Sequence, residues 1–311
     1  MGRLPTPIAS RLRLPLIAAP MFRVSGPDLV VAACRSGVIG AFPAANCRDT
    51  AELDEWLTRF DDTLSDSDAP YCPNLIIRHA DVADHVACVT KHRAEVVITS
   101  VGSPASVVGP LHDAGCLVLA DVASVHHARK AVEAGADGLV LLSAGAGGQT
   151  GWANGFAFVR AVRRFFAGPV VLAGGIADGH ALRAAEVLGC DLAYMGTRFI
   201  ATAESMAPDA YKQMLVASDL DDVLLTSAVT GLPTSILRPS LLEAGLDPDN
   251  MPTDVSENTA RALYGSGAPG PRRWRDIWSA GHSVSGVTAV PTVSELVEAT
   301  GHEYRAAGRP T

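Results

Sequence analysis

Two glycine turns contain groups that could bind a phosphate. Gly174-Gly175 and Gly196-Thr197 each follow a short apolar run, and glycine lets backbone N–H groups approach phosphate oxygens without a Cβ atom in the way. The Thr197 hydroxyl can add a donor, and the helix that follows would add a favourable dipole. Two such turns on consecutive strands indicate a phosphate site. The alternative is that both are only tight turns between a strand and a helix.

A third glycine-rich loop, over residues 143–151, could hold a flat ring. Its sequence is Ser-Ala-Gly-Ala-Gly-Gly-Gln-Thr-Gly, and Gln149 is its first side chain able to reach a bound ligand. The loop lacks the Gly-Lys-Ser/Thr ending of a Walker loop and the acidic residue of a Rossmann fold. Both of these nucleotide-binding classes are therefore excluded.

The elements that must position these loops repeat as strand, turn and helix. Continuous apolar runs predict strands buried on both faces, as in a parallel sheet wrapped by helices. Eight such units predict a (β/α)8 TIM barrel, whose active site lies in the loops after the strands and whose phosphate site follows strands 7 and 8. The predicted strands cover residues 16–19, 38–41, 72–77, 96–98, 117–120, 138–142, 170–173 and 192–195.

The strand and helix pattern stops after residue 217. Residues 218–270 are acidic and then rich in Pro, Gly and Ser, with weakly helical patches. We therefore expect a small α-rich accessory region or lid, inserted after strand 8, over the mouth of the barrel. The barrel domain would comprise residues 1–217 and 271–311. Helices over residues 274–279 and 292–307 would return the chain to it.

Composition excludes several classes of protein. The 311 residues are 48% hydrophobic with a formal net charge of −8, and the densest basic cluster is only Arg272, Arg273 and Arg275, which is too small for a nucleic-acid face. No apolar run reaches the roughly 20 residues that span a bilayer, and the N-terminal sequence is not that of a signal peptide. Six scattered cysteines without a CxxC pair indicate reduced, mostly buried thiols in the cytoplasm. No metal site is expected, and a homodimer is left open.

Four segments form a specific combination. They are Ala18-Ala19-Pro20-Met21, the loop 146–151, the turn 173–179, and residues 195–199 followed by Glu204-Ser205. Together they resemble the nitronate monooxygenase (2-nitropropane dioxygenase-like) family of FMN-dependent TIM barrels, to which flavin enoyl reductases of fatty-acid synthesis are related. Residues 230–233 and 278–281 resemble later family segments, so the similarity covers nearly the whole chain.

The resemblance implies an FMN site. The two glycine turns would hold the FMN phosphate, Pro20 and Met21 would border the isoalloxazine ring, and Asp121 would hold the polar edge of the flavin or its ribityl chain. Gly147 and Gly148 would pass under the ring. The implied cofactor-binding residues are Ala19, Pro20, Met21, Asn74, Asp121, Gly147, Gly148, Gln149, Ala173, Gly174, Gly175, Gly196, Thr197 and Gly281.

The chain departs from the family at Gln149, where a histidine is usual. Family members typically oxidise an alkyl nitronate, with one electron passing to FMN and O2 reoxidising the flavin. Histidine can take a substrate proton near neutral pH, whereas an amide only forms hydrogen bonds. We therefore hypothesise a substrate that is already ionised, bound by Gln149. His282, in the returning segment, is the histidine expected nearest the flavin, and it is the second candidate catalytic residue.

Three other readings are compatible with the same turns. The chain could be an NAD(P)H-dependent flavin reductase such as an enoyl reductase, although no nicotinamide site can be located. It could be a non-catalytic barrel that binds a flavin or another phosphate ligand. It could also be a phosphosugar isomerase or a guanosine-nucleotide enzyme, and the purified protein would then be colourless. Small-molecule substrate and O2 are the expected partners, with neither nucleic acid nor membrane.

Overall fold

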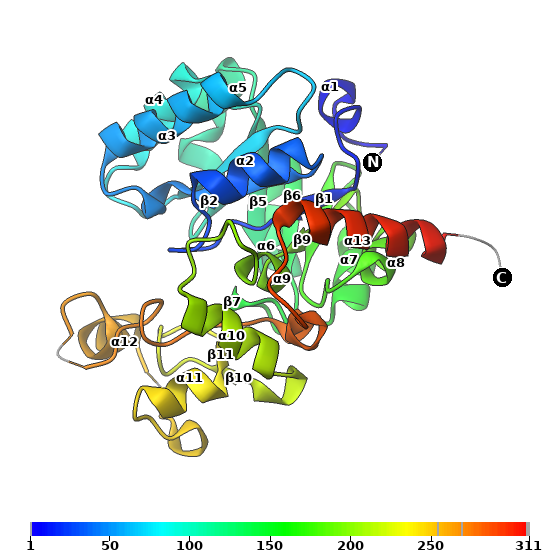
Figure 1. Cartoon of the computed structure of the whole chain (residues 1–311). Helices are drawn as coiled ribbons and strands as arrows, with labels where there is room; N and C mark the ends of the chain where they lie inside the picture. Colours follow the sequence, from blue (N-terminus) through cyan, green and yellow to red (C-terminus); the bar gives the residue numbers. More distant parts are fainter. Residues whose placement is uncertain (1, 254, 269, 309–311) are drawn as a thin grey trace.

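The computed structural model describes residues 2–253, 255–268 and 270–308, and its centre is a closed barrel of eight parallel strands (Figure 1). Each strand pairs with the next, and Ile17 of the first pairs with Tyr194 of the last, which closes the barrel. The predicted TIM barrel is confirmed. Its strands are β1 (Leu16–Ala18), β2 (Ile39–Pro43), β3 (Tyr71–Ile76), β4 (Val96–Ser100), β5 (Leu117–Val122), β6 (Gly138–Leu142), β8 (Val170–Ala173) and β9 (Leu192–Met195).

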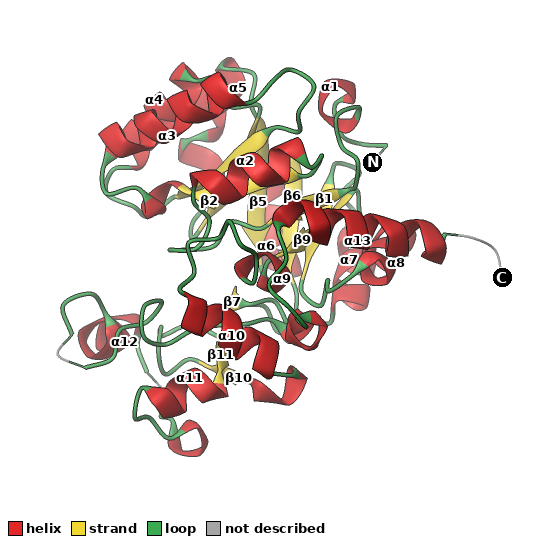
Figure 2. Ribbon diagram, viewed as in Figure 1, coloured by secondary structure: helices red, strands yellow, loops and turns green. Residues whose placement is uncertain are grey.

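Helices surround the barrel (Figure 2). Local signals set the ends of these helices: Asp49 caps one helix by accepting from the Glu52 N–H, and Gly135 and Gly189, in the left-handed region at φ 94° and 109°, each follow a helix. These helices are α1 (Thr6–Ala9), α2 (Pro27–Arg35), α3 (Thr50–Thr63), α4 (Val82–Lys91), α5 (Val108–Asp113), α6 (Val125–Glu133), α7 (Gly155–Val162), α8 (Gly179–Leu188) and α13 (Val293–Ala307). The last of them packs against both α8 and α2, so the C-terminal segment completes the outer layer.

The core has an inner and an outer part. Side chains such as Ile17, Ile98 and Val140 fill the barrel interior, while other apolar clusters lie between strands and helices. Asp191, just before β9, is 1% exposed and pairs with Arg163 at 2.6 Å, and it also accepts from the Val170 N–H. This ion pair fixes the end of the barrel opposite the mouth.

A second group of elements lies below the barrel in Figure 1. It is preceded by α9 (Thr197–Ile200) and α10 (Asp209–Ala217), and it contains β10 (Val223–Thr226), β11 (Thr234–Leu237), α11 (Arg238–Glu243) and α12 (Glu257–Tyr264). The expected α-rich region thus also contains strands, because β10 pairs with β11, and β11 pairs with the two-residue β7 (Gly148–Gln149). We keep residues 218–270 as a proposed accessory region.

The predicted helix over residues 274–279 is wrong. Trp274 has φ 66°, in the left-handed region, and Arg273 forms a bridge with Ile277, so the chain makes a tight turn here. Short 3-10 helices occupy Ala44–Asn46, Pro104–Ser106, Leu220–Asp222, Pro248–Asn250 and His282–Gly286.

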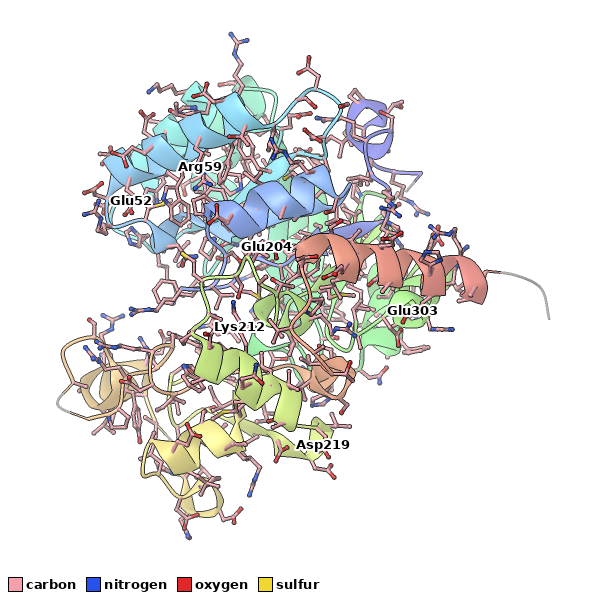
Figure 3. The ribbon with its side chains drawn as sticks, viewed as in Figure 1. Glu52, Arg59, Glu204, Lys212, Asp219 and Glu303 are labelled. Carbon is pink, nitrogen blue, oxygen red and sulfur yellow. The ribbon has the colours of Figure 1, made fainter. Side chains whose placement is uncertain are left out.

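Two polar side chains, labelled in Figure 3, fix the path from the barrel to the region below it. Glu204 accepts from the Val293 N–H at the start of α13. Lys212 of α10 is buried, and its ammonium donates to the carbonyls of Ala203 and Ser205. Among the described residues, no helix has the length and apolar character needed to cross a membrane.

Candidate functional site

A cavity of about 850 Å³ lies at the mouth of the barrel, where the loops after the strands meet the elements below. It brings together nearly every residue that sequence reasoning assigned to the site, although Gly281 and His282 do not line it. The lining residues among those predicted are Ala19, Pro20, Met21, Asn74, Asp121, Gly147, Gly148, Gln149, Ala173, Gly174, Gly175, Gly196 and Thr197.

The two glycine turns, Gly174-Gly175 after β8 and Gly196-Thr197 after β9, open into this one cavity. Gly175 has φ 73°, and a Cβ atom placed on it would meet no atom within 4 Å, so it faces open space. Within the described part of the chain, the N–H groups of Gly175 and Gly196 have no acceptor. Paired backbone groups are the rule in proteins, so these two donors are available to a ligand.

The structure gives little support to the expected contribution of a helix dipole behind the first turn. The helix α8 begins only at Gly179, and its N-terminal N–H groups are already satisfied, because Asp178 accepts from Ala181 and Glu303 accepts from Gly179 at 2.9 Å. The helix after the second turn, α9, has four residues. Any anion binding at these turns therefore depends on the turns' own N–H groups and on the Thr197 hydroxyl.

Gly281 contacts residues of the site although it does not line the cavity. Its N–H donates to the hydroxyl oxygen of buried Thr197 at 2.9 Å. A Cβ atom on Gly147 would come within 2.8 Å of the Gly281 nitrogen, so the two backbones cross in close contact. The absence of a side chain at Gly147 therefore admits the returning segment, whereas the expected reason was space for a ring. Gly148, at φ 67°, has more space above it.

Gln149 is exposed and lines the cavity, and its backbone is held by pairing with Thr234 of β11. His282 is different. Its N–H donates to the Gly145 carbonyl, and its ring packs so closely on Gly145 that a Cβ there would be 2.6 Å from His282 Nδ1. The imidazole is exposed and is not part of the cavity lining, although Gly145, which it contacts, is. The structure therefore gives no direct support to His282 as a catalytic residue, because its ring contacts the loop at Gly145 but does not itself line the cavity.

Buried polar groups form the floor of the cavity. Asp121 ends the fifth strand, and its Oδ1 has no hydrogen-bond partner among the described residues; the same holds for the Tyr194 hydroxyl opposite. Burial raises the pKa of Asp121 to about 7 and that of Tyr194 well above its ordinary value, to which Asp121 contributes. Asn74 accepts from the Ser100 hydroxyl at 2.9 Å. Leaving such groups unpaired costs about 1–3 kcal/mol each, so a polar ligand here would be stabilised.

The segment that follows β1 forms one wall. Ser25 is fully buried, its hydroxyl donates to the Ala19 carbonyl, and it accepts from the Met21 N–H at 3.0 Å. The Asn46 amide donates to the carbonyls of Met21 and Ser25. Pro20 and Met21 are therefore held rigidly at the cavity edge, and a rigid edge can orient a planar ligand.

Sequence reasoning missed the residues that line the cavity from below. Arg261, Arg272, Arg273 and Arg275 contribute to the lining, together with Trp274 and Trp278. The sequence shows the cluster Arg272, Arg273 and Arg275, but it was considered only as a possible nucleic-acid face. Its position at the mouth of the barrel depends on the turn at Trp274, which the sequence does not predict.

Two clusters of potential metal ligands lie outside the cavity: Asp54 with Cys88 and His92, and Asp178 with His180 and Glu303. In the first, Lys91 and His92 already pair with Asp54 at 2.6 and 2.8 Å, and they lower the pKa of Asp54 to about 2. In the second, both carboxylates accept N–H groups of α8. These contacts account for both clusters. All six cysteines are free, and five are buried, as expected.

The fold and the site define a TIM-barrel protein with a ligand cavity at the carboxyl ends of its strands, where glycine turns offer unpaired N–H groups. Residues 62–301 match the family model described as nitronate monooxygenase. The chain belongs to the nitronate monooxygenase family, and it is therefore related to oxidoreductases.

Relatives within and around this family differ in what they are named for. A (3aS,4S,5R,7aS)-5-hydroxy-7a-methyl-1-oxo-octahydro-1H-indene-4-carboxyl-CoA dehydrogenase of Mycobacterium tuberculosis is 31% identical over 78% of this chain and 68% of its own length. The enzyme of the same name from Rhodococcus jostii is 29% identical, and the match spans 64% of its length. A nitronate monooxygenase of Paraburkholderia phytofirmans is 27% identical over 75% of this chain and 76% of that protein.

Solved structures share the whole architecture. FabK from Thermotoga maritima superposes with a TM-score of 0.79 at 25% identity, covering 96% of this chain and 94% of that one. A nitroalkane oxidase from Streptomyces ansochromogenes gives a TM-score of 0.81 at 23% identity, covering 97% and 99%. The second likeness shows the fold alone.

Proposed function

We propose that the chain is an FMN-dependent oxidoreductase that oxidises a small anionic substrate, an alkyl nitronate or a similar compound, with O2. One observation carries the proposal: a single cavity joins the two glycine turns, the rigid edge at Pro20-Met21 and the unpaired Asp121. A phosphate group, a flat ring and a polar ring edge need these three surfaces. Membership in the nitronate monooxygenase family supports the same reading.

The residues present fit FMN. Its phosphate would be held by the N–H groups of Gly175 and Gly196 with the Thr197 hydroxyl, where a Cβ on Gly175 would otherwise project into open space. Its polar edge or ribityl hydroxyls would supply the donor that Asp121 Oδ1 lacks. When bound, FMN supplies the redox chemistry, and the protein supplies orientation, electrostatics and access.

The remaining proposed cofactor contacts follow from the cavity walls. Pro20 and Met21 would fix the plane of the ring from one side, and Gly148 would let it approach the backbone on another. Asn74, already oriented by Ser100, would present its amide to the ring edge. Gly281 would act indirectly, by fixing the Thr197 hydroxyl.

In this proposal, Gln149 determines which protonation state of the substrate the enzyme can use. The side chain can donate a hydrogen bond to an anionic oxygen, but it cannot accept a proton to become charged near neutral pH. No histidine among the described residues lines the cavity. A substrate that arrives as a nitronate needs no base, whereas a neutral nitroalkane does. Turnover of a nitronate should therefore exceed that of its neutral parent, and fast oxidation of the neutral form would contradict this assignment.

The visible spectrum of the purified protein tests the cofactor, followed by release and identification of the chromophore. We expect a yellow protein with one FMN per chain, and oxygen consumption when a nitronate is added. A colourless protein that takes up no FMN would refute the proposal and would favour a barrel for another phosphate ligand. A yellow protein without any turnover would indicate a flavin-binding barrel that is not an enzyme.

A second candidate is an NAD(P)H-dependent flavin reductase or dehydrogenase. Gln149 favours it, because hydride transfer through a flavin does not need a base at that position. The relatives named as indene-carboxyl-CoA dehydrogenases and the likeness to FabK support the same candidate. Anaerobic mixing with NADH or NADPH separates the two candidates. Rapid bleaching of the flavin favours the reductase, and an unchanged spectrum favours the nitronate oxidation.

A further inference from the structure

Positive charge is concentrated at the mouth of the cavity, although the whole chain carries a net charge of −8. Five arginines line the cavity, whereas Asp121 on the floor is the sole carboxylate of the described lining. The arginines are Arg23, Arg261, Arg272, Arg273 and Arg275. Because the arginines lie at the mouth and Asp121 lies on the floor, the electrostatic potential at the entrance of the cavity is positive and attracts anionic ligands.

Most of this charge is not neutralised by the protein. Arg272 and Arg275 share one carboxylate, Asp276, at 3.5 and 3.8 Å. Within residues 2–253, 255–268 and 270–308, Arg261 and Arg273 form no ion pair. Burial and the nearby Arg261 guanidinium lower the pKa of Arg273, whereas the Glu257 carboxylate, which forms no ion pair with Arg273, raises it. Glu257 and Asp276 together carry fewer charges than the five arginines, so an anionic ligand would be attracted to this group.

Backbone contacts fix the chain segment that carries Arg273 next to the helix that carries Arg261. The Arg273 N–H donates to the carbonyl of Tyr264 at 2.9 Å, which joins the returning segment to the end of α12, the helix that carries Arg261. The bridge from Arg273 to Ile277 and the left-handed Trp274 complete a tight turn. Because the backbone is already ordered, only the arginine side chains lose conformational freedom when an anion binds.

Trp274 connects this group to the interior of the cavity. The end of its ring would lie 3.9 Å from a Cβ atom on Gly148, the residue before Gln149. Trp278 also lines the cavity, and it stacks on Tyr211 with ring centroids 5.0 Å apart. A ligand that contacts the arginines can therefore extend past aromatic surface to Gln149. Aromatic faces suit a planar base, and guanidinium forks suit phosphate oxygens in bidentate pairs.

We propose that Arg261 and Arg273, with Arg272 and Arg275 beside them, bind the phosphate groups of a nucleotide-bearing substrate or co-substrate whose reacting end extends to Gln149. Several arginines beside aromatic surface suit a ligand that carries a planar base and more than two phosphate oxygens, such as a diphosphate-linked adenosine with an additional ribose phosphate. Coenzyme A thioesters and NADPH both carry this group. The location of the reacting end rests on the proposed flavin site, whereas phosphate binding at the arginines does not.

The test measures binding to the purified protein, with the flavin content recorded for each sample. Coenzyme A, dephospho-coenzyme A, NADPH and NADH are titrated by calorimetry at low salt. We expect binding of coenzyme A or NADPH, and a Kd at least about tenfold higher for the form that lacks the ribose phosphate, because a charge-assisted hydrogen bond is lost. Preference for coenzyme A identifies the substrate class, and preference for NADPH identifies the co-substrate.

Variants assign the binding to these residues. Arg261→Ala and Arg273→Ala should each raise the Kd at least about tenfold, and Arg273→Lys should raise it less, because it keeps the charge and loses the fork. Arg238→Ala is the matched control, since Arg238 is another arginine of the region below the barrel, pairs with Asp249 and does not line the cavity. It should leave the Kd unchanged.

Three results would overturn the proposal. The first is that neither coenzyme A nor NADPH binds at about 1 mM. The second is equal binding by Arg261→Ala, Arg273→Ala and the control. The third is loss of FMN from Arg273→Ala with nucleotide binding intact, because the arginines would then serve the flavin. Absence of FMN from all samples with nucleotide binding retained would refute the proposed function alone.

Discussion

The Thr197 hydroxyl accepts a hydrogen bond from the Gly281 N–H at 2.9 Å, and both groups are buried. This bond joins the turn after the last barrel strand to the segment that returns from the region below the barrel. The proposed phosphate end of the site is therefore not formed by the barrel alone. Its geometry depends on a residue far along the chain.

Removing the acceptor should loosen this junction. Thr197→Val keeps the shape of the side chain but leaves the buried Gly281 N–H unpaired, which should lower the free energy of unfolding by about 1–3 kcal/mol. Thr197→Ser retains the hydroxyl and should keep most of the stability. Chemical denaturation of the three proteins measures this. Equal stability of the Val and Ser variants would show that the bond contributes nothing.

A methyl group at Gly175 should interfere with the phosphate specifically. The strain of a left-handed alanine costs about 1–2 kcal/mol of stability, and the new Cβ would occupy the open space proposed for the phosphate. Gly175→Ala should therefore lower both stability and FMN affinity, the affinity by at least about tenfold.

Gly115 provides the matched control for this prediction. It has φ 84°, compared with 73° at Gly175, and a Cβ there would also meet no atom within 4 Å, but it precedes β5 outside the cavity. Gly115→Ala should cost a similar amount of stability without changing FMN binding. Fluorescence titration of flavin-free protein compares the two, and equal affinities would contradict the phosphate assignment.

The barrel could be predicted from the sequence because each strand is a continuous apolar run followed by a polar or glycine turn. The positions of Gly174-Gly175 and Gly196-Thr197 follow from counting the predicted strands, since the carboxyl ends of all strands in a barrel lie on the same side. The pairing of Gln149 with Thr234 could not be predicted in the same way, because β7 has two residues and its partner strand is distant in the chain.

The chemistry of the site was less predictable than its location. The unpaired Asp121 is invisible in the sequence, because it depends on which groups from other strands fail to reach it. His282 is next to Gly281 in the chain but does not line the cavity, because proximity in the chain does not determine which side chains reach a site. Likewise, the close contact of Gly147 with the Gly281 backbone could not be predicted, because the two residues are far apart in the chain.

The stability of the flavin-free protein should depend on pH through Asp121. Burial raises its pKa from the ordinary 3.8 to about 7, so between these values the unfolded chain releases a proton that the folded protein keeps. Stability from this group is therefore full below about pH 4, falls as the pH rises to about 7, and then levels off. Asp121→Asn should remove that decline.

The variant should exceed the wild type in unfolding free energy by about 1–3 kcal/mol at pH 8, and by little near pH 4. This difference in stability is smaller than the free energy that corresponds to the whole pKa shift, because the Asp121 side chain is partly exposed to solvent in the cavity. Urea denaturation across this range provides the measurement. An identical pH dependence in both proteins would mean that Asp121 is paired or solvated in the folded state.

Gln149 allows a gain-of-function experiment, because its backbone is fixed by pairing with Thr234 and its exposed side chain borders the cavity. Gln149→His would introduce a group that can take a proton from a neutral nitroalkane. A positioned base typically contributes about 10²–10⁴-fold, so turnover of the neutral substrate should rise by at least tenfold. That gain should appear as the pH rises through about 6.5, where imidazole becomes neutral. The control Gln149→Asn also places an amide at this position, so turnover of the neutral substrate should not rise. If the histidine variant prefers the nitronate as strongly as the wild type does, the absence of a base at position 149 does not explain that preference. The proposed role of Gln149 in selecting an ionised substrate would then be wrong.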